Sequence, residues 1–81
     1  MIYLIVYSSI TSATRVKKIM NSLGESVSII QTPKSIPVND CSYSIKVLNG
    51  QLKIAIQNSQ KYGFKSRGVY EQIGENEFRE V

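Results

Sequence analysis

The alternation of apolar and polar residues predicts a strand and then a helix in the first third of the chain. Residues 2–7 form an uninterrupted apolar run rich in β-branched and aromatic side chains, which is typical of a buried strand. Apolar side chains then recur at helical spacing over residues 13–23, after a hydroxyl-rich segment, residues 8–12, that suits a helix N-terminus. Gly24 is a residue type that commonly follows the end of a helix, so the helix is expected to stop there.

The remaining pattern adds three strands and a second helix. Residues 27–31 and 43–47 each indicate a strand, and two prolines keep the segment between them out of a central sheet. A helical stripe over residues 52–62 ends at Gly63, and residues 66–73 indicate the last strand.

This β-α-β-β-α-β order predicts an α+β fold, a single ferredoxin-like domain over residues 1–73. The expected sheet is antiparallel and four-stranded, in the order 4-1-3-2, with both helices on one face. Residues 74–81 either return as an extra C-terminal edge strand or form an acidic tail. In this topology the ends of the first two strands and the starts of the last two share one pole of the sheet.

The first strand is apolar on both faces, which leaves its orientation open. If its even-numbered positions face the helices, the odd-numbered ones form an uncovered stripe, namely Tyr3, Ile5 and Tyr7. An uncovered apolar stripe often marks an association surface. The sequence therefore allows a non-catalytic binding or regulatory module that forms a homodimer through this stripe, with ordinary packing as the alternative.

The formal net charge of +4 on 81 residues is unevenly distributed. Residues 1–70 carry nine of the ten basic side chains and only two acidic ones, whereas residues 71–81 carry four acidic side chains and one basic. A basic body attracts an anion, a nucleic acid or an acidic partner, or it simply keeps a small domain soluble. The RNA-recognition motif shares the predicted topology, but residues 42–48 lack its glycine-rich, multi-aromatic signature, so no nucleic-acid partner is expected.

Missing residue types exclude most enzyme chemistry. The chain has no histidine and a single cysteine, Cys41, which excludes imidazole catalysis, an internal disulfide and a Cys/His metal site. We therefore expect no metal and no cofactor, and no conventional enzyme of these classes. The longest apolar run is far shorter than the ~20 residues that cross a bilayer, and a lone thiol fits a reducing compartment. Both observations predict a cytoplasmic protein without a membrane segment.

Cys41 is the one candidate for reactive chemistry. The predicted pole would gather the hydroxyl-rich start of the first helix, the segment 32–41 and the turn 61–65, which places the thiol near a helix dipole and several lysines. Nearby positive charge favours a thiolate, whereas the adjacent Asp40 disfavours it. The alternative is a small, semi-apolar residue at the start of a strand.

A short motif around this cysteine resembles a known family. Thr32-Pro33-Lys34 is followed after a short gap by Cys41, and the chain opens on Tyr3-Leu4-Ile5-Val6. Over residues 2–70 the sequence is similar to the "putative selenium/sulfur carrier protein-like" family of small bacterial domains. That family typically has arginine where Lys34 stands and glycine where Ser42 stands. Lysine keeps the charge but lacks the planar fork of arginine.

The resemblance implies a carrier function. Cys41 would hold sulfur or selenium as a persulfide or selenosulfide and pass it to a protein partner, with a donor or acceptor enzyme as that partner. Thr32, Lys34 and Ser42 would orient or stabilise the terminal anion. The binding module described above stays open as the alternative.

Overall fold

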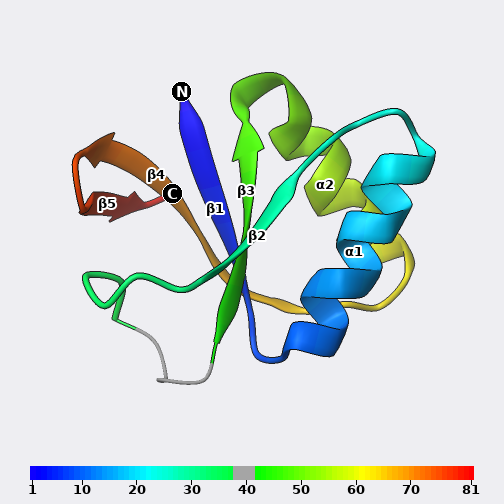
Figure 1. The fold of residues 1–81 in the computed structure, drawn as a ribbon, viewed down its shortest axis with the longest axis horizontal. Helices are drawn as coiled ribbons and strands as arrows, with labels where there is room; N and C mark the ends of the chain where they lie inside the picture. The colour runs from blue at the N-terminus through cyan, green and yellow to red at the C-terminus, as the bar shows by residue number, and fades with distance from the viewer. Residues whose placement is uncertain (38–41) are drawn as a thin grey trace.

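The computed structural model describes residues 1–37 and 42–81. Within them the chain forms β1 (Ile2–Tyr7), α1 (Ile10–Ser22), β2 (Ser28–Gln31), β3 (Tyr43–Leu48), α2 (Asn49–Lys61), β4 (Ser66–Gly74) and β5 (Glu77–Glu80). Figure 1 shows the two helices side by side along one side of the sheet.

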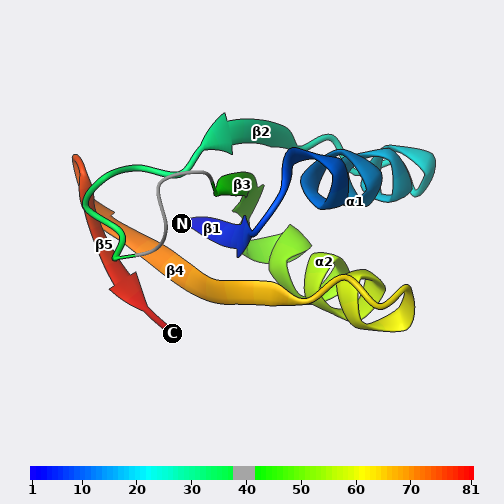
Figure 2. The ribbon, with the colours of Figure 1, turned by 90° about the horizontal axis from the view of Figure 1, so that it is seen from below.

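The sheet is antiparallel throughout, with the strand order β2-β3-β1-β4-β5. The α+β class is as predicted, but the order differs from the predicted four-stranded 4-1-3-2 because a fifth strand pairs with β4. Asn76 permits the tight return into β5, since its φ of 60° lies in the left-handed region that asparagine tolerates. In Figure 2 β5 and the adjoining end of β4 lie at the end of the molecule away from the helices, near the segment that follows β2.

Both helices have boundaries that the local chemistry explains. The Ser9 side chain accepts a hydrogen bond from the backbone N–H three residues on, at 3.2 Å, which caps α1. α2 follows β3 without a linker, and the Leu48 N–H donates to Oε1 of Gln51 at 3.0 Å. Gly24 and Gly63 follow the two helix ends with φ values of 80° and 77°. Neither helix in the described parts of the chain is long and apolar enough to cross a membrane.

The helices cover the face of β1 that carries Tyr3, Ile5 and Tyr7. Ile5 and Tyr7 have no exposed surface, and Tyr3 packs partly buried against the same cluster. The other buried members of this cluster are Ala13, Val16, Met20, Val27, Ile45, Val47 and Ala55. The prediction of an uncovered interaction surface at Tyr3, Ile5 and Tyr7 is therefore wrong, and with it the reason to expect a homodimer there. The strand is apolar on both faces, so its alternation does not indicate which face the helices take.

The opposite face of the sheet is buried by a different cover. Leu4 and Val6 of β1 pack with Tyr70 of β4 in a second apolar cluster. Ile36, from the segment that follows β2, completes this cluster and is only 2% exposed. Phe78 of β5 packs against its edge. A loop residue and an edge strand thus shield the face that the helices leave open.

Candidate functional site

The ends of four strands meet where residues 32–37 leave the sheet. Tyr7, at the end of β1, lies opposite Tyr43 at the start of β3 and opposite Ser66 at the start of β4. Gln31, at the end of β2, pairs with Tyr43 from its other side. α1 begins at Ile10, directly after β1, so its N-terminus belongs to the same pole (Figure 1). The shared pole that the topology predicts is therefore present.

Thr32 fixes the first part of the following segment to this pole. Its backbone N–H donates to the carbonyl oxygen of Ser42 at 3.2 Å, and its hydroxyl shares a hydrogen bond with the Ser44 hydroxyl at 2.8 Å. Ser44 is fully buried, so this bond is shielded from competition by water. These two hydrogen bonds thus join the chain before residue 38 to the chain after residue 41.

A tight turn displays Lys34. The Ile36 N–H donates to the Pro33 carbonyl oxygen at 3.1 Å, and Lys34 and Ser35 occupy the exposed middle of the turn. Ile36 is buried in the second apolar cluster, with Leu4, Val6 and Tyr70, which we call the open-face cluster. This burial anchors the turn to the sheet. Lys34 therefore extends into solvent from a backbone that is fixed on both sides.

The structure brings some of the predicted site residues together. Ser42 is 2% exposed, and its carbonyl group accepts the hydrogen bond from Thr32. Lys34 follows Thr32 by two residues, on the exposed side of the turn. Cys41 lies outside the described residues, together with residues 38–40, so its role as the carrier thiol stays a prediction.

Basic side chains gather near the pole. The first turn of α1 contains no acidic side chain of its own to oppose the positive end of the helix dipole. Lys61, Lys65 and Arg67 are all exposed between the end of α2 and the start of β4. Positive charge of this kind stabilises a thiolate or another small anion.

A groove opens between the C-terminal end of α2 and the start of β4. It has a volume of about 450 Å³ and is lined by Ile5, Ile56, Ser59, Gln60, Gly63, Phe64, Lys65, Ser66 and Val69. Beside it, the Tyr7 and Ser59 hydroxyls share a short hydrogen bond within the core. Burial raises the pKa of the Tyr7 phenol, and the hydrogen bond with Ser59 opposes that rise only in part. The periodicity of the sequence does not predict this groove; its one signal is an apolar residue, Phe64, directly after Gly63.

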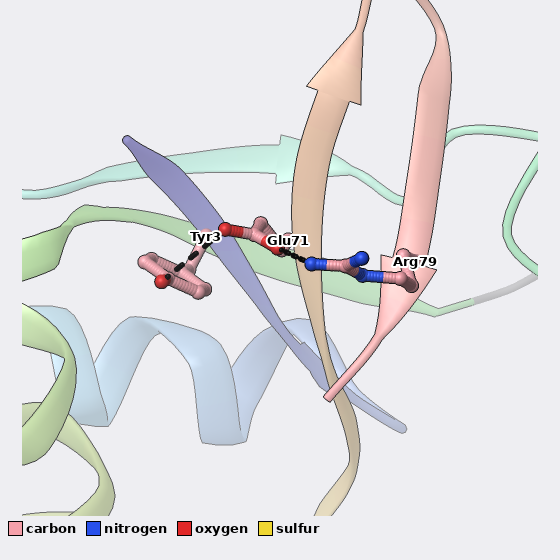
Figure 3. Close-up of polar contacts among 3 residues, drawn as sticks. All are labelled: Tyr3, Glu71 and Arg79. Carbon is pink, nitrogen blue, oxygen red and sulfur yellow. Dashed lines mark hydrogen bonds and ion pairs between the residues drawn. The ribbon is translucent and has the colours of Figure 1, made fainter.

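A buried carboxylate that the sequence did not single out joins three strands. Glu71 of β4 has a side chain only 4% exposed, and Arg79 of β5 donates to its Oε1 at 2.5 Å. The Tyr3 hydroxyl of β1 approaches Oε2 at 3.5 Å, which is a long contact (Figure 3). Tyr3 and Tyr7 lie at opposite ends of β1, so these contacts hold β5 to the sheet at a distance from the pole.

Comparison with known proteins gives one finding. A family model described as "Putative Se/S carrier protein-like" matches residues 2–71. No curated protein and no solved structure matches the chain. The matched span contains both helices, the segment 32–37 and the cysteine, and it ends within β4, before β5 begins.

Proposed function

The chain belongs to the Se/S carrier protein-like family, and on that premise we propose that Cys41 carries a sulfur or selenium atom to a partner enzyme. The observation that carries this proposal is the family match itself, because the matched residues include the single cysteine of the chain. The described flanks of that cysteine support it. Thr32 and Ser42 are tied together beside the exposed Lys34, whose charge would stabilise an anionic sulfur.

The transfer is a thiolate exchange. The Cys41 thiolate attacks the terminal sulfur of a persulfide on a donor cysteine and forms a new S–S bond to it. The S–S bond of the donor breaks, and the donor sulfur leaves as a thiolate with the bonding electron pair. The reaction starts and ends with one thiolate and one persulfide, so there is no net oxidation, reduction or proton transfer. With a donor selenosulfide the new bond is S–Se, and an acceptor thiolate discharges Cys41 by the same step.

The neighbouring residues have distinct proposed roles. Lys34 supplies a positive charge to the terminal anion, without the bidentate fork of an arginine. Thr32 fixes the base of the turn that carries Lys34, through its bonds to Ser42 and Ser44. Ser42 follows Cys41 in the sequence and contributes a hydroxyl group.

Loading with a purified cysteine desulfurase and free cysteine tests the proposal by intact-mass measurement. We expect the wild-type protein to gain the mass of a sulfur atom, to lose it on treatment with dithiothreitol, and the Cys41→Ser variant to gain none. A selenocysteine lyase with selenocysteine provides the parallel test for selenium. A wild-type protein that gains no more sulfur or selenium than Cys41→Ser contradicts the proposal.

The role of Lys34 is tested against a matched exposed lysine. Lys34→Gln should slow loading several-fold, because it removes the charge that favours the anion. Lys34→Arg should preserve the rate. Lys18→Gln removes an exposed charge from the second half of α1 and should leave the rate unchanged. Equal rates for Lys34→Gln and Lys18→Gln would exclude a role for Lys34.

A further inference from the structure

The groove between α2 and β4 is apolar inside. Ile56 of α2, Phe64 of the connecting turn and Val69 of β4 line it, and the buried Ile5 of β1 lies beneath them. These three side chains are only partly buried. They pack against the apolar cluster beneath the helices, and part of each side chain remains exposed to the groove. A volume of about 450 Å³ is sufficient for a bulky apolar side chain.

The edge of the same groove is cationic. Lys65 lines it, and the exposed Lys61 and Arg67 flank it in the sequence. No acidic residue occurs anywhere in residues 42–70. The acidic Glu80 of β5 pairs with Tyr70, whose side chain lies in the open-face cluster, so Glu80 is directed to the other side of the sheet from the groove.

The groove also lies next to the pole. Ser66 lines the groove and pairs with Tyr7, and Tyr7 pairs on its other side with Tyr43. Ser66 is therefore about 10 Å from Tyr43, the distance of two strand spacings. A protein seated in the groove would extend over the strand ends from which residues 32–37 depart.

We propose that this groove docks a partner protein through an acidic segment that inserts a bulky apolar side chain. The apolar walls accept the inserted side chain, and Lys65, together with the neighbouring Lys61 and Arg67, attracts the acidic residues beside it. A nucleic acid would use the same cations, but its bases stack on aromatic rings, and Phe64 is the only ring among the described lining residues. The identification of the partner as a sulfur or selenium donor rests on the proposed function, whereas the docking itself does not.

Fluorescence anisotropy with a labelled peptide of alternating glutamate and phenylalanine tests the docking. We expect saturable binding that weakens as salt is added, and much weaker binding of a peptide in which serine replaces every phenylalanine. Lys65→Glu should weaken binding of the phenylalanine peptide about tenfold, the equivalent of one reversed rim charge. Lys18→Glu reverses an exposed charge on α1, outside the groove, and serves as the matched control.

Amide chemical shifts locate the bound peptide. The changes should concentrate on residues that line the groove, above all Gln60, Gly63, Lys65 and Ser66. Changes that concentrate on α1 instead overturn the proposal. Equal binding of the serine peptide, or equal losses in Lys65→Glu and Lys18→Glu, also overturn it, because charge alone would then explain binding. A polyuridine oligonucleotide that binds more tightly than the peptide and displaces it would assign the cations to nucleic acid and overturn it too.

The docking proposal and the carrier proposal can be contradicted independently of each other. Peptide binding measured on Cys41→Ser should equal that of the wild type, so a protein that never accepts sulfur still reports on the groove. A wild-type protein that loads sulfur from a desulfurase but does not bind the peptide contradicts the docking alone.

Discussion

The two faces of the sheet are both buried, but different parts of the chain bury them. On one face two helices cover Ile5 and Tyr7, and several strands and both helices contribute side chains to the cluster. On the other face the cover over Leu4 and Val6 depends on Ile36 and on β5. Ile36 belongs to the segment that leads toward the cysteine. The same side chain therefore contributes to the stability of the fold and holds a segment of the candidate site in place. Among the described residues, the helix face borders the groove between α2 and β4 instead of the segment that leads toward the cysteine.

The largest effect is expected on the helix face. Ile5→Ala removes a fully buried side chain from the centre of the sheet and should lower the free energy of unfolding by about 4 kcal/mol, because the surrounding elements cannot close the cavity. Urea unfolding followed by far-ultraviolet circular dichroism measures this loss. Leu48→Ala truncates a side chain that is 57% exposed and should change stability by less than about 0.5 kcal/mol. Similar losses in the two variants would contradict the assignment of Ile5 to the core.

A truncation on the open face should lower stability less than one on the helix face, but it should slow sulfur loading more. Ile36→Ala should lower the free energy of unfolding by about 2 kcal/mol, at the low end for such truncations, because a loop can settle into the space. Under conditions where both variants are folded, it should slow sulfur loading more than Met20→Ala does, because Met20 is fully buried on the helix face and does not line the groove. A stability loss as large as that of Ile5→Ala, or loading equal to that of Met20→Ala, would remove the distinction between the faces.

The attachment of β5 to the sheet is the third test. Arg79→Leu leaves the buried Glu71 carboxylate without its ion-pair partner and should lower the free energy of unfolding by about 1–2 kcal/mol, less than for a fully buried pair because Arg79 is 65% exposed. Combining it with Glu71→Gln should recover part of the loss. Tyr3→Phe removes only a long contact and should change stability by less than about 0.5 kcal/mol. An Arg79→Leu variant as stable as Tyr3→Phe would show that the ion pair does not hold β5.

The sequence predicts local patterns well and their tertiary consequences poorly. The shared pole follows from the order of the elements, and its strand ends are found together. The sequence does not predict which face of β1 the helices cover, because that strand is apolar on both faces. Only the packing of the helices on one face, and of Ile36 and β5 on the other, determines it. β5 has a single apolar residue, Phe78, among charged ones, so its sequence resembles a tail until its pairing with β4 is known. The anchoring of Thr32 by Ser44 and the groove beside Phe64 depend on contacts between distant segments, which no periodicity encodes.

The smallest expected effect concerns two hydroxyl pairs, the buried pair of Tyr7 and Ser59 on the helix face and the partly buried pair of Thr32 and Ser44 on the open face. Tyr7→Phe deprives the buried Ser59 of this partner and should lower the free energy of unfolding by about 1 kcal/mol at neutral pH. Burial raises the pKa of Tyr7 in the folded protein, so as pH rises above about 10 the unfolded phenol ionises first and stability declines. That contribution to the alkaline decline should be missing in Tyr7→Phe. It should persist in Thr32→Val, because aliphatic hydroxyls do not titrate in this range. Urea unfolding of both variants at neutral and alkaline pH measures the difference, and an unchanged alkaline decline in Tyr7→Phe would show that the buried phenol does not contribute to it.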